Sequence, residues 1–450
     1  MRIRFWGTRG SLAKPGPATV RYGGNTSCVE VRTADGTLIV LDCGTGAHDL
    51  GRALLASGEP ARRGHLLISH THWDHIQGFP FFAPLFTPEC EWDVYAPRGL
   101  SRSLEATLAG QMEYAYFPIT LAQMGASIRY HDIVEGAFEA GGVAVVARYL
   151  NHPALALGYR LEADGVKVVY ATDHEPHSRH QPLWPMAASA PAAPIHPEDQ
   201  RHIDFLAGAD LVVHDAQYTE AEYPAKMTWG HSSAAHAVDF AVAAGARRLA
   251  LFHHDPIRDD AAIDRLVDVC RARAAGVGSP LEVFAAAEGQ GIDLEPAGKG
   301  SGLAPASTRD PLLSSAASAR PATILIADDD AEVVSLLSDA LAPGGFRLLC
   351  AFDGETALAL ARSELPDLIL LDWSMPRRDG LQVCRAVRDA EEPRLRGVPV
   401  VLLTARTTAE DTQTGFKAGA TDYIVKPFKP AHVRSRVESW LLRGSAPTRP

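Results

Sequence analysis

The sequence predicts an α/β protein with two domains, and three observations support this. Within 1–295, several apolar, strand-like segments each end in histidine or aspartate residues. Within 322–445, four short apolar segments each end in a single polar group, which is typical of an open parallel sheet. Between them, 296–321 is rich in Ala, Ser, Gly and Pro and has no helical or strand period, so we interpret it as a flexible linker.

The chain opens with an alternating, strand-like segment that runs into the glycine-rich stretch Gly7–Ser11. A second turn, Tyr22–Thr26, leads into the apolar segment that ends at Val31. We interpret the glycines of both stretches as hairpin turns.

A run of six residues after the apolar segment Leu66–Ser69 contains three histidines and one aspartate. Unpaired buried His and Asp are costly, so folding alone does not account for this density. Imidazole and carboxylate suit Zn²⁺, and also Mn²⁺ or Fe²⁺. The spacing allows His70 and His72 to face one ion, and Asp74 and His75 a second.

This HxHxDH run after a strand resembles the metallo-β-lactamase superfamily. The resemblance implies an αββα sandwich, two mixed sheets flanked by helices, with a dinuclear metal centre between the sheet edges. It implies that Asp42 orients the metal-binding loop. Of two neighbouring histidines we prefer His253 to His254, because it comes first after its strand. The implied ligands are His70, His72 and His152 for one metal, Asp74, His75 and His253 for the other, and Asp173 as the bridge.

Two ions about 3.5–4 Å apart activate a water molecule and polarise the group it attacks. Such a site hydrolyses a phosphodiester, a lactone, a thioester or an amide. The redox branch of the superfamily has Glu in place of the second histidine, whereas this chain has His72. We therefore expect hydrolysis.

A second constellation consists of His214-Asp215-Ala216-Gln217 after an apolar segment, and His231-Ser232-Ser233 farther along. It resembles the paired motifs of ribonuclease Z and related phosphodiesterases, with Asp for Glu and Gln for Thr. The resemblance implies that Asp215 and His231 relay a proton to the leaving group, and with Asp74 they form the expected catalytic set. Alternatively, His231–Ser233 only caps a helix, since Ser is a preferred N-cap. The N-terminal turns likewise resemble the cyclic-nucleotide and small-phosphodiesterase side of the superfamily.

The second domain has four strand-like segments: Thr323–Ala327 before an acidic run, Leu368–Leu371 before Asp372, Val400–Leu403 before Thr404, and Tyr423–Val425 before Lys426. These polar groups should meet at one edge of a parallel sheet. Clustered carboxylates repel one another unless a cation is present, so Asp328, Asp329 and Asp372 imply Mg²⁺.

This order resembles the response-regulator receiver domain, a doubly wound (βα)₅ fold. The resemblance implies phosphorylation of Asp372, with the Ser374 backbone completing the site. It implies that Thr404 and Tyr423 form a switch pair, that Lys426 assists the phosphoryl group, and that the Lys426–Pro427 peptide is cis. The expected phosphodonor is a sensor histidine kinase or a phosphotransfer protein.

The composition of the chain restricts the kinds of substrate and partner that we expect. The net charge is −11 and no basic block is present, which disfavours long nucleic acids and favours a small phosphodiester. The six cysteines have no paired spacing, no signal peptide is visible, and no apolar run reaches the ~18 residues of a membrane span, so we expect a cytoplasmic protein. The low-complexity stretch 182–197 is interpreted as a surface insertion in preference to a lid.

The expected function is a metal-dependent phosphodiesterase that is regulated by aspartate phosphorylation in a phosphorelay. A homodimer is a candidate assembly. Two alternatives remain. One is a lactonase or thioesterase on the same fold. The other is a non-enzymatic signalling protein, in which the metal domain binds a partner.

Overall fold

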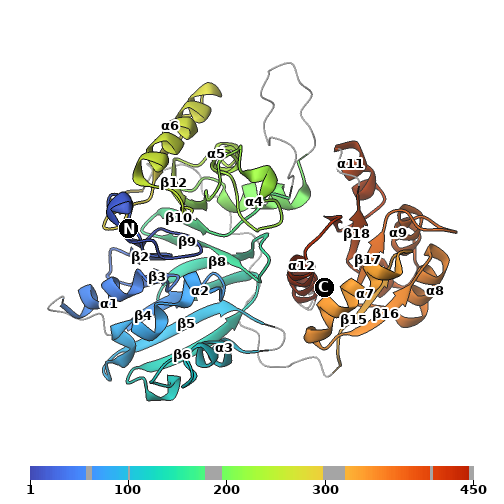
Figure 1. Cartoon of the computed structure of the whole chain (residues 1–450), viewed down its shortest axis with the longest axis horizontal. Coiled ribbons are helices and arrows are strands. Elements are labelled where there is room, and N and C mark those ends of the chain that lie inside the picture. The colour runs from blue at the N-terminus through green and yellow to red at the C-terminus, as the bar shows by residue number, and fades with distance from the viewer. Residues whose placement is uncertain (57–62, 100–101, 178–194, 297–319, 406–408, 445–450) are drawn as a thin grey trace. The chain divides into compact units, whose positions relative to one another are not determined.

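A computed structural model describes residues 1–56, 63–99, 102–177, 195–296, 320–405 and 409–444. Its elements form two compact units, one within residues 1–296 and one within 320–444, and Figure 1 labels many of them. Residues 182–194 of the expected insertion and 297–319 of the expected linker lie outside the described residues.

The first unit contains two mixed sheets of seven strands. In the first sheet the order is β14 (Gly291–Asp293), β1 (Arg2–Gly7), β2 (Cys28–Arg32), β3 (Leu38–Leu41), β4 (Arg63–Leu67), β5 (Glu91–Pro97) and β6 (Ser127–Ile133). In the second it is β13 (Glu282–Ala285), β12 (Arg248–Phe252), β11 (Leu211–Asp215), β10 (Val166–Ala171), β9 (Leu157–Ala163), β8 (Val143–Tyr149) and β7 (Gly136–Ala140).

Helices cover the outer face of each sheet. Those beside the first sheet are α1 (Ala47–Ala56), α2 (Trp73–Ile76) and α3 (Leu104–Gln111). Those beside the second are α4 (Pro197–Leu206), α5 (Ala234–Ala243) and α6 (Asp260–Gly276). Short 3-10 turns lie at Pro17–Thr19, Phe79–Phe81, Ala83–Phe86, Leu121–Gln123 and Tyr223–Ala225.

The side-chain alternation of the strands explains these layers, because successive side chains point to opposite faces. In β3, Leu38 and Val40 belong to the core beneath α1 and α3, while the alternate residues are buried outside that core. On the inner faces, the rings of Phe5 in β1 and Phe252 in β12 lie 6.1 Å apart, so the two sheets face each other. The expected αββα sandwich is confirmed.

The second unit is a parallel sheet in the order β16 (Arg347–Ala351), β15 (Thr323–Ala327), β17 (Leu368–Asp372), β18 (Val400–Thr404) and β19 (Asp422–Val425). Its helices are α7 (Ala331–Leu341), α8 (Gly354–Glu364), α9 (Gly380–Arg388), α10 (Pro393–Arg396), α11 (Ala409–Lys417) and α12 (Pro430–Gly444), and a 3-10 turn lies at Ala342–Gly344.

Two separate cores show that the sheet of the second unit is covered on both faces. One core joins β15, β17 and β18 to α8 and α9, and the other joins the opposite faces of these strands to α7 and α12. The doubly wound (βα)₅ fold is thereby confirmed. None of the described helices in either unit has both the length and the apolar character needed to cross a bilayer.

Candidate metal centre and phosphorylation site

The strands of the first unit deliver the expected ligands to one end of the sandwich. Each ligand-bearing segment begins within three residues of a strand's last residue: His70 after β4, His152 after β8, Asp173 after β10 and His253 after β12. The short helix α2 begins at Trp73, and its first turn carries Asp74 and its last His75. Loops far apart in the sequence therefore place their donors in one small volume.

The donor atoms gather in three overlapping sets, each with its atoms within 4.8 Å of one another. The sets are His70, His72, His152 and Asp173; Asp74, His75 and His253; and Asp173, Asp215, His231 and His253. All seven ligands expected from the sequence lie within these sets: those expected for one metal fall in the first set with Asp173, and those expected for the other make up the second. His254 belongs to none of the sets among the described residues, and its Nε2 lies 2.9 Å from the Ala286 carbonyl oxygen.

Asp173 lies between the first two sets and directs one carboxylate oxygen at each. Its Oδ2 is 3.6 Å from His70 Nε2 and 3.7 Å from His152 Nε2. Its Oδ1 is 3.2 Å from His75 Nε2 and 3.1 Å from His253 Nε2. This division of oxygens is the arrangement that a carboxylate bridging two cations requires.

The chemistry of the donors fits divalent cations. The Nε2 atoms of His70 and His75 are buried and have no hydrogen-bond partner among the described residues. Burial, together with neighbouring imidazoles, holds the pKa of His70 well below its usual value, and burial lowers that of His152 to about 3. Both shifts favour the neutral ring, which metal coordination requires.

The pKa of His75 is shifted in the opposite direction. Burial opposes its protonation, but the carboxylates of Asp74, Asp173 and Asp42 outweigh burial and raise its pKa well above the usual value. A buried site with this excess of negative charge needs a compensating cation, and divalent ions would supply it.

The carboxylate of Asp42 lies next to the donors and takes part in four hydrogen bonds. Its carboxylate accepts from the Ser69 amide at 2.6 Å, the Ser69 hydroxyl at 2.8 Å and the Tyr170 hydroxyl at 2.7 Å. Its Oδ2 also lies 2.7 Å from His75 Nδ1, which fixes the orientation of that ring. This agrees with the expected role in orienting the loop.

Three of these residues have a left-handed backbone, with φ of +60° at Asp42, +53° at Asp173 and +61° at His253. Such conformations are costly for residues other than glycine, and they concentrate at functional sites. The strand ends are strained at the points where they present carboxylates and imidazole to the centre.

The N-terminal glycine-rich stretch takes part in the site, a role that its interpretation as a hairpin turn missed. A Cβ on Gly10 would lie 2.2 Å from Nδ1 of His253, so only glycine fits beside that ring. The Ser11 amide donates to Asp74 Oδ2 at 2.7 Å. The sequence signal was the small-residue stretch itself, but its partner His253 is far away in the chain.

The expected relay residues are in contact. Nδ1 of His231 lies 2.7 Å from Oδ2 of Asp215. Burial would lower the pKa of His231, but the Asp215 carboxylate overcomes this and raises it to about 9. Capping also occurs nearby, since Ser233 N-caps α5 by accepting from the His236 amide. The capping therefore falls to Ser233, while His231 makes its own contact with Asp215.

Glu175 is a second residue that the sequence analysis missed. Its buried carboxylate accepts from the Thr228 amide at 2.7 Å and the Gly230 amide at 3.0 Å. The Gly230 carbonyl oxygen in turn lies 3.0 Å from His152 Nδ1. Glu175 therefore holds the loop that orients His152 and leads into His231. Its proximity to Asp173 in the chain was the only signal available.

An open pocket of about 480 Å³ lies in front of these donors. Four of the residues lining it are donors already described, and the others are Ser11, Thr71 and Trp73. The Trp73 side chain is 74% exposed. A substrate entering the pocket meets the donors, two hydroxyl groups and an aromatic ring.

The second unit gathers its acidic residues at the carboxyl edge of the sheet. Oxygen atoms of Asp328, Asp329 and Asp372 lie within 4.8 Å of one another. Lys426 Nζ donates to Asp328 Oδ2 and to Asp372 Oδ1, each at 2.6 Å. The Ser374 amide donates to the remaining oxygen of Asp372 at 2.7 Å. The Lys426–Pro427 peptide is cis, which confirms that expectation.

Burial, reinforced by the neighbouring Asp372 carboxylate, raises the pKa of Asp328. Asp328 is fully buried and Asp372 is 6% exposed, so their repulsion is poorly screened. The oxygen-only donor set fits Mg²⁺, which binds through one or two carboxylates and keeps several waters.

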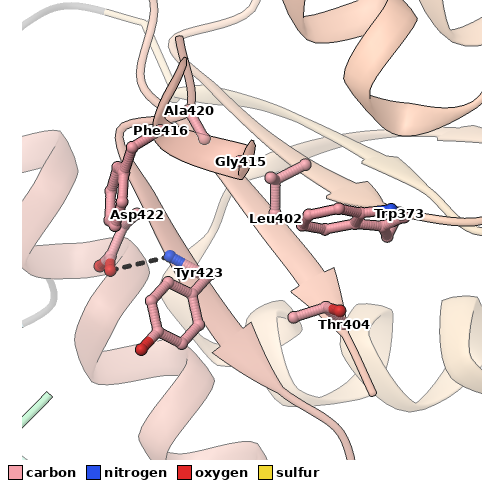
Figure 2. A pocket seen from close by; sticks show the side chains of 8 residues that line it. All are labelled: Trp373, Leu402, Thr404, Gly415, Phe416, Ala420, Asp422 and Tyr423. Carbon is pink, nitrogen blue, oxygen red and sulfur yellow. Dashed lines mark hydrogen bonds between the residues drawn. The ribbon is translucent and has the colours of Figure 1, made fainter. Parts of the chain in front are cut away.

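The expected switch residues line a second pocket, shown in Figure 2, beside the neighbouring strands β18 and β19. Thr404 and Tyr423 lie on its lower side, opposite Leu402 and Gly415. The ring of Tyr423 contacts Phe416 edge-on, with centroids 6.0 Å apart. Trp373, which follows Asp372 in the chain, forms another part of the lining.

Two family models match the chain. Residues 37–254 match the beta-lactamase superfamily domain, and residues 324–438 match the response regulator receiver domain. The DNA-binding response regulator MtrA of Mycolicibacterium paratuberculosis is 42% identical over 120 residues, which are 27% of this chain and 51% of that protein. The chain thus spans about half the length of the curated relatives it matches.

Solved structures match each unit. The short form of human tRNase Z is 20% identical, with a TM-score of 0.44, over 65% of this chain and 99% of the other. A putative response regulator from Chloroflexus aurantiacus is 37% identical, with a TM-score of 0.26, over 27% of this chain and 98% of the other.

Proposed function

Since the chain joins a beta-lactamase superfamily domain to a response regulator receiver domain, we propose that it is a metal-dependent phosphodiester hydrolase regulated by phosphorylation of Asp372. The observation that carries the proposal is the division of the Asp173 oxygens between two donor sets beside the Asp215–His231 pair. The expected substrate is a small phosphodiester.

In this proposal His70, His72 and His152 would hold one ion, Asp74, His75 and His253 would hold the other, and Asp173 would contribute to both. Zn²⁺, Mn²⁺ and Fe²⁺ all suit these donors. When bound, the ions would supply Lewis-acid stabilisation of the phosphoryl group and activation of a water molecule.

The chain's own residues supply the remaining steps. His231 enters the reaction protonated on the side that faces the pocket, because Asp215 stabilises the imidazolium from the other side. As the bond to the leaving group breaks, His231 donates a proton to the departing oxygen. Asp215 keeps the ring oriented through Nδ1, and general acids of this kind contribute about 10²–10⁴ in rate.

The receiver supplies regulation in the same proposal. Asp372 accepts a phosphoryl group from a histidine kinase or a phosphotransfer protein, with Mg²⁺ held by Asp328, Asp329 and Asp372. Lys426, which already contacts two of these carboxylates, would then contact the phosphoryl group. Thr404 and Tyr423 would adjust as the switch pair.

An activity screen tests the hydrolase. The metal-loaded protein is expected to hydrolyse bis-p-nitrophenyl phosphate faster than lactone or thioester substrates. Preferential hydrolysis of a lactone or thioester would assign the site to that reaction. A protein with two bound metals per chain and no activity on any of these substrates would favour a non-enzymatic module.

A further inference from the structure

Ser11 occupies an unusual position at the rim of the metal pocket. It is exposed and lines the pocket together with Asp173 and His231. Its backbone has φ of +62°, a left-handed conformation that costs a serine free energy. A strained residue with a polar side chain in a functional pocket calls for a functional explanation.

Contacts on both sides hold Ser11 in this conformation. Its amide donates to Asp74 Oδ2 at 2.7 Å, which ties it to the candidate metal centre. The preceding residue, Gly10, donates its amide to the His254 carbonyl at 3.0 Å and lies against the His253 ring. The backbone of Ser11 is therefore fixed relative to the donor atoms.

The hydroxyl of Ser11 is oriented by a buried amide. Gln217 Nε2 donates to Ser11 Oγ at 3.2 Å, and Gln217 is only 3% exposed. Gln217 is itself held at both ends of its backbone. Its amide donates to Asp215 Oδ1 at 3.0 Å, and its carbonyl accepts from Arg258 at 2.9 Å.

The direction of the remaining proton follows from these contacts. A serine hydroxyl has one proton to donate and two lone pairs to accept with. Because Gln217 donates to the oxygen from the buried side, the proton is left to point away from Gln217, and the exposed side is the pocket. A donor there complements an anionic oxygen, and hydrogen bonds to charged groups are the stronger ones.

We propose that the Ser11 hydroxyl donates a hydrogen bond to a non-bridging phosphoryl oxygen of the substrate, and that Gln217 is the positioning residue that directs it. This inference rests on the proposed phosphodiesterase function and adds a substrate-binding group that is not a metal ligand. It also links substrate binding to the relay, since Gln217 contacts both Ser11 and Asp215.

The test compares Ser11→Ala and Ser11→Gly in the metal-loaded full-length protein. Both changes remove the hydroxyl, but glycine relieves the left-handed backbone whereas alanine retains the strain. Leu12→Ala, at an exposed neighbour outside the pocket lining, is the matched control. Both Ser11 variants are expected to lose about 10- to 100-fold in kcat/KM, with metal content unchanged. Leu12→Ala is expected to match the wild type.

Two further measurements separate a hydroxyl contact from a structural effect. Inorganic phosphate, titrated calorimetrically into each metal-loaded protein, is expected to bind more weakly to both Ser11 variants than to the control. Gln217→Met should give a smaller loss, and adding it to Ser11→Ala should cause little further loss, because it acts through the same hydroxyl.

Three results would overturn this inference. Wild-type activity in Ser11→Gly, with loss only in Ser11→Ala, would show that the hydroxyl serves to hold the left-handed backbone and would overturn its contact with the substrate. Unchanged kcat/KM and phosphate affinity in both variants would overturn it as well, while leaving the phosphodiesterase function intact. A wild type that neither hydrolyses phosphodiesters nor binds phosphate would overturn the proposed function, and this inference with it.

Discussion

Asp173 is the single side chain on which both donor sets depend. Its two oxygens lie 3.1–3.7 Å from four different imidazoles. The residue is 1% exposed, so its charge is hardly screened by solvent. Loss of this carboxylate should therefore be felt at both positions, whereas loss of a histidine should be felt mainly at one.

We predict that Asp173→Asn lowers bound metal from about two ions per chain, the number a dinuclear site implies, to one or fewer. The amide keeps the size of the side chain but offers only one oxygen and no charge. Elemental analysis of purified protein measures the change. Asp268→Asn, at an exposed position of α6, is the control and should retain the wild-type content. Full metal content in Asp173→Asn would contradict the bridge.

His231 provides the second prediction at this scale. His231→Ala should reduce kcat by about 10²-fold or more with metal content unchanged. The loss should be smaller for p-nitrophenyl esters than for alkyl esters, because a good leaving group needs no proton. Steady-state kinetics on a matched series of leaving groups measures this. An equal loss across the series, or a loss of metal, would instead indicate the ligand role that its distance from Asp173 and His253 allows.

At the scale of elements, the loop before α5 depends on Glu175. The Thr228 and Gly230 amides both donate to one carboxylate, and Thr228 and Gly230 have φ of +70° and +86°. A Cβ on Gly230 would lie 2.4 Å from His152 Nδ1, so the loop lies directly against a metal ligand. The loop is thus a rigid support for His152.

We predict that Glu175→Gln weakens metal binding by about 10-fold or more through His152, an effect typical of partners that orient a ligand. The amide has one acceptor oxygen for two backbone donors, and its NH₂ group faces one of them. Metal titration against a competing chelator measures the change. Exposed Glu105, on α3, supplies the control variant Glu105→Gln. Unchanged affinity would show that the loop keeps its conformation without the charge.

Strands β5 and β6 are joined by side chains as well as by backbone. The Asp93 carboxylate receives two hydrogen bonds from Arg129, at 2.7 and 2.8 Å, and lies 2.9 Å from His131 Nε2. The Arg129 hydrogen bonds outweigh the effect of burial and hold the pKa of Asp93 well below its usual range.

This depressed pKa gives stability that is present above the unfolded-state pKa of about 3.9 and is lost as the pH falls towards the folded-state value. We predict that Asp93→Asn lowers the free energy of unfolding at pH 7 by about 2 kcal/mol. The difference from wild type should shrink below about pH 4. Urea unfolding between pH 7 and 3 measures both effects, and a difference independent of pH would show that the charge of Asp93 does not matter.

At the scale of the whole molecule, the proposal requires the receiver to change the behaviour of the hydrolase. Phosphorylation shifts an equilibrium only by its differential free energy, and couplings of about 1–3 kcal/mol are typical. We therefore predict a change of about 5- to 150-fold, at most, in turnover or in dimerisation when Asp372 is phosphorylated.

The comparison is wild type against Asp372→Ala, each with and without an acyl-phosphate donor and Mg²⁺. Turnover and sedimentation are measured on the full chain. The donor should affect the wild type only. If it changes neither turnover nor association state in the wild type, phosphorylation does not regulate this hydrolase.

The two fold classes, and most of the side chains that gather at the two sites, could be predicted from the sequence. The spacing of His70–His75 and the order of Asp372, Thr404 and Lys426 are patterns in the sequence, and such patterns can be recognised without knowledge of the fold. An apolar strand that ends in a polar residue also predicts the position of that residue, since strand ends meet at a sheet edge. These features could therefore be inferred before any coordinates.

The contacts that these groups make with one another depend on the tertiary structure. Several contacts join residues from different loops. The two Asp173 oxygens face different imidazoles, and His253 packs against Gly10. Gln217 donates a hydrogen bond to Ser11, and the Gly230 amide donates one to Glu175. Ser11 and Gln217 are 206 residues apart in the chain. Neither periodicity nor spacing encodes such a pair, because the distance between two loops is set by the packing of the sheets that carry them.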